Sequence, residues 1–187
     1  MEPSASSGSS GGEVFNGGEV DPIFYPNHSE LNAKLYPLLI GWSEKRDDHR
    51  LHSNQVTFFR LENSWHSPND LHEQELFRPL CDFIEERVSS IMNAPLQIFS
   101  MWSIIGTNRS QGGRHFHVGS VSGAYYVNNG HEEGENISAS IHFHGSGGVK
   151  SFEPQDGQIL LFPAPLEHHV DAYLGSNRRV VISFNLR

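Results

Sequence analysis

The chain has 187 residues, of which 36% are hydrophobic, and this length suits one compact domain with its own core. Its 22 acidic residues outnumber its 13 basic residues, and no cluster of lysine and arginine is present, so we expect no nucleic-acid partner. No apolar run approaches the roughly 18 residues of a membrane span, so we expect no membrane partner either.

The single cysteine and the first residues bear on where the protein acts. Cys81 is alone, which excludes an internal disulfide and a cysteine-rich zinc site. The opening MEPSASSGSSGG has neither the basic and apolar blocks of a secretory signal nor the arginines of a transit peptide. We therefore expect a soluble, cytoplasmic protein, with residues 1–19 as a disordered glycine- and serine-rich tail and residues 20–187 as a single domain.

Two amphipathic helices are predicted after a short extended segment at residues 21–27. The first covers residues 29–48, with Ser29 as N-cap, and the second covers residues 69–94, with Asn69 or Asp70 as cap. Pro37 and Pro79 are expected to kink or break them. Apolar residues recur at spacings of three and four, as in helices that cover a core: Leu31, Leu35, Leu38 and Leu39, then Leu76, Leu80, Phe83, Ile84, Val88 and Ile91.

From Pro95 onward the chain changes to short β-type runs separated by Gly, Asn, Asp and Pro. The runs are LQIFSMWSIIG, SGAYYV, SASIHFH, GQILLF, HHVDAY and RRVVISFNLR. Helices first and strands afterwards indicate an α+β, mainly β fold, in which the N-terminal helices pack on a sandwich or barrel.

The positions of the 12 histidines suggest a metal site. His115 and His117 are two residues apart, so they point to one face if that segment is extended, and together they supply half of a site. His168 and His169 are neighbours in a predicted strand, so only one of them can face the same interior. The alternative interpretation is that all four are ordinary solvated loop and strand histidines.

A second pair, His142 and His144, has the same spacing in the stretch SIHFHG. If this pair also turned inward, the histidines would form a three- or four-histidine centre like that of the cupins, a related sandwich fold. The alternative is that both lie on the surface or beside a substrate.

Three stretches resemble one known family when they are taken together. They are HFHVGSVSGAYYV at 115–127, PQDGQILLFPAPLEHHV at 154–170 and RRVVISFN at 178–185. In this order they are similar to the iron(II)- and 2-oxoglutarate-dependent dioxygenases, within them to a small group with H-x-H followed by SG-x-YY. The upstream stretch at 53–71 also looks like that group. The resemblance spans most of residues 20–187 and implies a double-stranded β-helix, a cupin-like jelly roll with the metal in its mouth.

The resemblance implies roles for five residues. His115 matches the first metal ligand and His168 the distal histidine. Arg179 matches the basic residue that grips the far carboxylate of 2-oxoglutarate, and Ser183 lies four positions on along the same strand face. A guanidinium can bind a carboxylate through two parallel hydrogen bonds, and a hydroxyl can add a third. Tyr126 matches a tyrosine that commonly reaches the co-substrate.

Strand alternation and one departure from the family pattern leave questions open. Only one of Arg178 and Arg179 can face inward, and Tyr125 should face away from Tyr126. His117 stands where the wider family has a carboxylate, so the expected ligand set is His115, His117 and His168. Three-histidine iron centres occur in related sandwiches, and the exchange affects the redox balance of the metal.

The resemblance implies an enzyme that uses Fe(II) and 2-oxoglutarate. It would release succinate and CO2 and hydroxylate a C–H bond of an unidentified small-molecule or peptidyl substrate. Two alternatives remain: a cupin-like three-histidine metal dioxygenase that does not use 2-oxoglutarate, in which His142 or His144 would matter and Arg179 would not, and a non-catalytic jelly-roll binding module. The oligomeric state is left open, a homodimer included.

Overall fold

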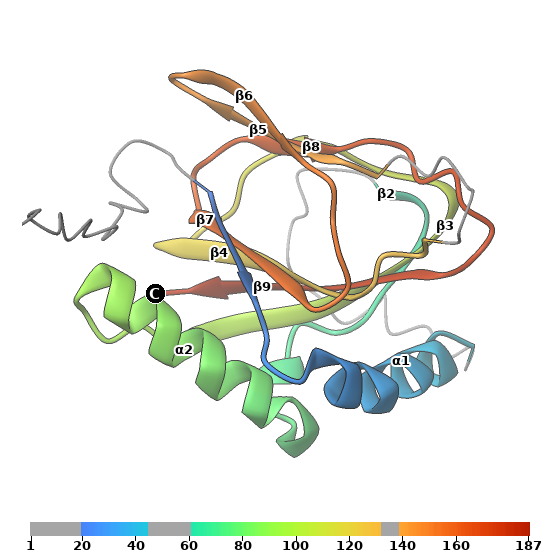
Figure 1. Cartoon of the computed structure of the whole chain (residues 1–187), viewed down its shortest axis with the longest axis horizontal. Coiled ribbons are helices and arrows are strands. Elements are labelled where there is room, and N and C mark those ends of the chain that lie inside the picture. The colour runs from blue at the N-terminus through green and yellow to red at the C-terminus, as the bar shows by residue number, and fades with distance from the viewer. Residues whose placement is uncertain (1–19, 45–60, 132–138) are drawn as a thin grey trace, which may run out of the picture.

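A curled antiparallel sheet with two helices on one side dominates the computed structural model (Figure 1). The structure describes residues 20–44, 61–131 and 139–187, so the expected tail at 1–19 lies outside the described residues. The elements in chain order are β1 (Asp21–Phe24), α1 (His28–Glu44), β2 (Leu61–His66), two 3-10 turns (Leu71–Glu73 and Glu75–Phe77), α2 (Arg78–Met92), β3 (Ile98–His115), β4 (Val121–Asn128), β5 (Ile141–Gly145), β6 (Gly148–Phe152), β7 (Gln158–Pro163), β8 (His168–Val170) and β9 (Arg179–Leu186).

The long strand β3 joins two layers of the sheet. The strand order is β1-β7-β4-β9-β3-β8-β5-β6, and β2 pairs with β3 beside this path. The first part of β3 pairs with β9, whereas its last residues pair with β8. The larger layer, β1-β7-β4-β9-β3, therefore continues into the smaller layer, β8-β5-β6, which lies above it in Figure 1. This arrangement agrees with the predicted mainly β jelly roll.

The two predicted helices are present, but their starts differ from the prediction. α1 begins at His28 rather than after a Ser29 cap, and Pro37 lies inside the helix. α2 begins at Arg78, and neither its N-cap nor Asp70 makes a side-chain cap hydrogen bond. Pro79 lies in the first turn of α2, where a missing backbone N–H costs no helical bond. None of the described helices is long and apolar enough to cross a membrane.

Both helices cover the outer face of the larger layer with their apolar stripes. Buried leucines, isoleucine and valine of α1 and α2 form one core with that face of β3, β4, β7 and β9: Leu31, Leu35, Leu39, Leu80, Ile84 and Val88. Leu76, predicted on the buried face of the second helix, precedes α2 and is exposed.

A second core lies between the two layers of the sheet. It contains Ala124 and Tyr126 of β4 together with Phe143 of β5 and Phe162 of β7. Tyr125 belongs to the first core, on the helix side, where its hydroxyl donates to Asn32 of α1. Because neighbouring strand residues face opposite sides, Tyr126 and not Tyr125 faces the space between the layers, as predicted.

Candidate metal centre

Three histidines meet between the layers, where β3 ends and β8 begins. His115 is the last residue of β3 and pairs in register with His168, the first residue of β8. His117 lies two residues further on, held by a backbone hydrogen bond from its N–H to the Ala164 carbonyl. The ring centroids are 4.2 Å apart for His115 and His168 and 5.1 Å apart for each other pair. Their candidate ligand atoms all lie within 4.8 Å of one another, so one ion could reach all three.

Backbone carbonyls set the tautomers of two of these rings. Nδ1 of His115 lies 2.7 Å from the Gly113 oxygen, and Nδ1 of His168 lies 2.9 Å from the Leu166 oxygen. A carbonyl oxygen only accepts, so each Nδ1 must carry the proton and Nε2 keeps its lone pair. This is the pattern by which metal-ligating histidines are usually oriented.

Burial keeps the three imidazoles neutral. It lowers the pKa of His117 to about 3, with the neighbouring His115 as a second cause. It also lowers the pKa of His168 to about 3, again with a contribution from His115. The pKa of His115 is lowered by burial and partly restored by its bond to Gly113. Neutral imidazoles are the form that binds metal, so the triad needs no deprotonation near neutral pH.

Lowering the pH is expected to destabilise the metal-free protein. Above about pH 6.5 the three imidazoles are neutral in both the folded and the unfolded chain. The folded pKa of His117 and of His168 is about 3, so between about pH 6.5 and pH 3 the unfolded chain binds protons that the folded chain excludes. The free energy of unfolding therefore decreases as the pH is lowered through this interval. Urea unfolding at about pH 7 and about pH 5, with a chelator present, measures this loss.

The His117→Gln variant is the control for this pH dependence. It removes one of the groups that the unfolded chain protonates, so its free energy of unfolding should fall less than that of the wild type over the same interval. An equal fall in both proteins would show that other groups are responsible.

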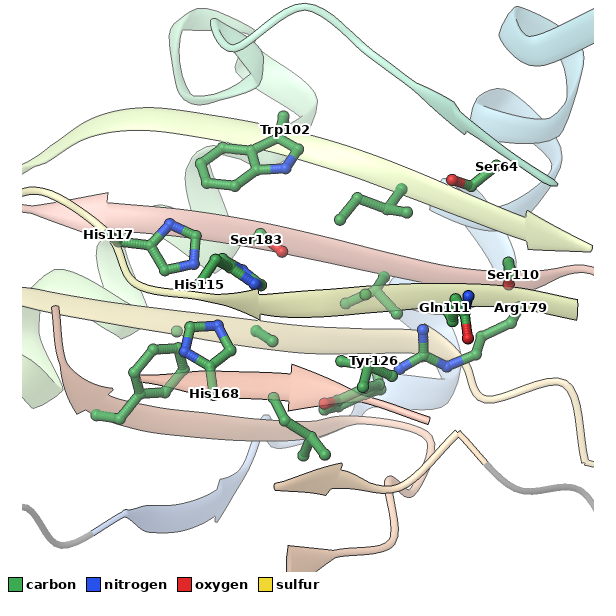
Figure 2. Close-up of a pocket in the computed structure, with 18 residues that line it drawn as sticks. Ser64, Trp102, Ser110, Gln111, His115, His117, Tyr126, His168, Arg179 and Ser183 are labelled. Carbon is green, nitrogen blue, oxygen red and sulfur yellow. The ribbon is translucent and has the colours of Figure 1, made fainter. Parts of the chain in front are cut away.

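The triad lies at one end of a pocket and a buried cation lies at the other (Figure 2). The pocket holds about 680 Å³ of empty space, part of it open to solvent. Arg179, the first residue of β9, is 8% exposed and its guanidinium lies 5.4 Å from the centre of the Tyr126 ring. Arg179 is buried beside Tyr126, whereas Arg178 is exposed. The inward residue of the arginine pair is therefore Arg179.

The structure does not bring Ser183 together with Arg179. Both residues line the pocket. Ser183 pairs with Trp102 of β3 and Arg179 pairs with Gly106, so the two are four positions apart on β9. At about 3.3 Å per residue their backbone positions are about 13 Å apart along the strand. Ser183 instead lies toward the triad (Figure 2). A hydrogen bond from Ser183 beside Arg179 therefore stays a prediction.

Two other serines, which sequence reasoning missed, lie nearer to Arg179. Ser64 of β2 pairs with Gly106, which in turn pairs with Arg179, so the three lie in one row across the sheet. Gly106 leaves the space that Ser110 fills, because a Cβ there would lie 2.3 Å from the Ser110 hydroxyl. Both serines line the pocket on the Arg179 side (Figure 2).

The donor set of the pocket fits an anionic ligand that also reaches a metal. The Arg179 Nε and the Ser64 hydroxyl are buried and have no hydrogen-bond partner among the described residues. Such groups cost free energy unless a ligand or water pairs with them. Among the described residues, those that line the pocket include Arg179 but no aspartate or glutamate. 2-Oxoglutarate, with a carboxylate at each end, matches a cation at one end and a metal at the other.

The rival histidines lie on the opposite face of the same strands. His142 and His169 are direct partners across β5 and β8, next to the inward pair Phe143 and His168. His142 and His144 therefore do not join the triad, and the four-histidine arrangement is not formed. His169 points away from the triad, as strand alternation predicts.

The comparisons with known proteins agree with this geometry. Residues 100–185 match the family described as "Putative 2OG-Fe(II) oxygenase". This stretch covers almost all of β3 to β9, with the triad and Arg179. No curated protein matches the chain. The matched stretch, which carries the triad, Arg179 and most of the pocket, is thus similar to the 2OG-Fe(II) oxygenases, in agreement with the predicted resemblance.

Solved structures of such enzymes share the fold at low identity. A prolyl-4-hydroxylase from Pseudomonas putida matches with a TM-score of 0.64 and 13% identity, covering 90% of this chain and 92% of that chain. HygX from Streptomyces hygroscopicus, with nickel and 2-oxoglutarate bound, matches with 0.63 and 12%, covering 92% and 84%. A Trichoplax adhaerens prolyl hydroxylase, in complex with a hypoxia inducible factor peptide fragment, matches with 0.60 and 12%, covering 89% and 83%. These likenesses confirm the double-stranded β-helix.

Proposed function

We propose that the protein is an iron(II)- and 2-oxoglutarate-dependent oxygenase whose iron is held by His115, His117 and His168. The observation that carries this proposal is one pocket with three converging neutral imidazoles at one end and a buried, incompletely bonded Arg179 at the other. Iron with 2-oxoglutarate and dioxygen supplies the oxidising chemistry, which couples release of succinate and CO2 to hydroxylation of a C–H bond.

The residues of the pocket bind and orient the co-substrate. Arg179 would hold the far carboxylate of 2-oxoglutarate, with the Tyr126 side chain and the hydroxyls of Ser64 and Ser110 as the neighbouring polar groups. A cation, a buried unpaired Nε and hydroxyls select a carboxylate over a neutral group at that position. Ser183, toward the triad, is left as a group for the end of the co-substrate near the metal.

The ligand set gives the centre a different charge from that of a two-histidine, one-carboxylate site. Three neutral imidazoles contribute no negative charge, so a bound divalent ion keeps its full charge before the co-substrate enters. Together with Arg179 this makes the pocket strongly attractive to a dianion. We therefore expect binding of 2-oxoglutarate to depend more on the metal than in a carboxylate-containing site.

We propose that the substrate approaches over the segment that carries His117. Phe116 and Val118, on either side of this ligand, are 52% and 66% exposed. These apolar groups suit the apolar part of a small molecule or a peptide. Solved structures of similar fold contain one of each, hygromycin B in HygX and a peptide fragment in the Trichoplax adhaerens prolyl hydroxylase. A free, buried Cys81 and a net charge of −9 support a cytoplasmic enzyme that acts on neither nucleic acid nor membranes.

An anaerobic titration tests this function. Ferrous iron is added to metal-free protein, followed by 2-oxoglutarate, while the visible charge-transfer absorption of a chelated complex is recorded. We expect the band to appear only with both present, and succinate to form slowly once air is admitted. Iron binding without the band would favour a three-histidine dioxygenase that does not use 2-oxoglutarate, and no iron binding would leave a non-catalytic jelly-roll module.

A further inference from the structure

A second group of metal-binding side chains lies on the outer face of the smaller layer. His142 of β5 and His169 of β8 are direct cross-strand partners, and Asp171 follows the end of β8. Because neighbouring strand residues face opposite sides, His168 points to the triad and His169 points outward. The two groups therefore lie back to back on the same strand.

The nitrogen and oxygen atoms of this outer group converge. Nε2 of His142 lies 2.9 Å from one carboxylate oxygen of Asp171, and Nε2 of His169 lies 3.8 Å from the other. The two rings are nearly parallel, at 15°, with centroids 4.6 Å apart. This resembles the pair His117 and His168 in the triad, at 20° and 5.1 Å. The candidate ligand atoms all lie within 4.8 Å of one another.

Each imidazole of the outer group has its other nitrogen held by a neighbour. Nδ1 of His142 lies 2.7 Å from the hydroxyl of Ser151, its partner on β6. Nδ1 of His169 lies 2.8 Å from Nε2 of His144. Both rings are thus oriented through Nδ1 while Nε2 faces the carboxylate. Metal-ligating histidines are characteristically held in this way by a second set of hydrogen bonds.

We propose that His142, His169 and Asp171 form a second metal site, which binds a divalent transition-metal ion such as Zn²⁺. Two imidazoles and one carboxylate are ligands that Zn²⁺ and Cu²⁺ favour. The side chains of His142, His169 and Asp171 are 20%, 33% and 41% exposed, so water can complete the coordination. The pocket and Arg179 lie on the other face, so this ion would not meet the co-substrate. Its role is to clamp β5 to β8, the strand that carries His168.

Zinc stoichiometry of the full chain tests the second site. Metal-free protein is dialysed against a chelator-buffered zinc solution, and bound zinc is measured by elemental analysis. We expect two equivalents in the wild type, because three histidines also bind zinc. Asp171→Asn keeps the shape of the side chain but removes its charge, and it should bind one equivalent. Ser151→Ala, which removes only an orienting bond, should weaken the outer site by about tenfold.

The triad variant His115→Ala/His168→Ala separates the two sites. It should keep one equivalent, and adding Asp171→Asn should remove it. His131→Ala, which changes an exposed histidine outside both groups, should keep two equivalents. A wild type that binds a single equivalent, lost in the triad variant and kept in Asp171→Asn, would overturn the second site and leave the proposed function intact. A wild type that binds a single equivalent, kept in the triad variant and lost in Asp171→Asn, would support the second site and remove the metal centre of the proposed function.

Discussion

Replacing His168 with alanine is expected to abolish tight iron binding at the triad and the formation of succinate. His168 is 3% exposed, pairs with His115 and holds its Nε2 toward the other two rings through the bond to Leu166. Mutation of a group that only hydrogen bonds to a metal ligand typically weakens metal binding by about 10- to 100-fold. Loss of a ligand itself should therefore weaken iron binding by at least about 100-fold. Ferrous iron affinity under anaerobic conditions measures the effect directly.

Two controls make this result specific to the triad. His131→Ala removes an exposed imidazole and should leave iron affinity unchanged. Thermal unfolding of the metal-free proteins should show that His168→Ala still folds, because the alanine removes a polar group from the wall of a pocket rather than from a closed core. Iron affinity equal to that of the wild type in a folded His168→Ala protein would rule out the triad as the iron site.

The His117→Asp variant tests the unusual ligand set. A carboxylate at this position would recreate two histidines and one carboxylate, the set typical of non-haem iron(II) oxygenases. We expect this variant to keep iron binding where His117→Ala loses it. The added negative charge should weaken 2-oxoglutarate binding, because the centre then attracts the dianion less. Stronger 2-oxoglutarate binding in His117→Asp would contradict the charge argument.

Periodicity was sufficient to predict the helices and most strands, but only where one face is buried. The stripes of α1 and α2 and the runs that became β3, β4, β7 and β9 have apolar residues that enter a core. Strand β6 (Gly148–Phe152) was missed because four of its five residues are exposed and the last is only partly buried. A strand with no buried face has no apolar alternation to detect. Its pairing with β5 comes from the hairpin and not from its own pattern.

The ligands of the triad could be proposed from spacing and resemblance. The residues that surround Arg179, at the other end of the pocket, could not all be found from the sequence. Alternation correctly places Arg179 and Ser183 on one face, but it says nothing about how far apart they lie along β9. Ser64 and Ser110 are near Arg179 only because β2, β3 and β9 are in register at Gly106. Register between distant strands depends on the whole fold, so no local pattern in the sequence indicates it.

The outer histidines show the same limit. His142 and His144 could be recognised as a pair, but their face depends on how β5 pairs with β8. A shift of one residue in that pairing would exchange Phe143 and His142 and turn the pair inward. The structure has the register in which Phe143 enters the inner core and the histidines meet His169 and Asp171 outside.

Replacing Arg179 with methionine is expected to remove 2-oxoglutarate binding and to leave iron binding in place. Methionine has a similar length without the charge, so the variant loses the carboxylate partner with little loss of packing. Truncating one partner of a buried, hydrogen-bonded charge pair costs about 2–5 kcal/mol, which corresponds to roughly 30- to 5000-fold weaker binding. The anaerobic absorption band, titrated with 2-oxoglutarate on the iron-loaded protein, measures this change.

Arg178 provides a matched control because it is the same residue type one position earlier and is exposed. Arg178→Met should bind 2-oxoglutarate as the wild type does. Arg179→Lys should lie between the two, since an ammonium keeps the charge but cannot form two parallel hydrogen bonds. Equal binding by Arg179→Met and Arg178→Met would mean that Arg179 does not hold the co-substrate. Weak binding by Arg179→Met with full recovery in Arg179→Lys would mean that Arg179 contributes its charge and not its paired geometry, and that Tyr126 and the neighbouring serines orient the carboxylate.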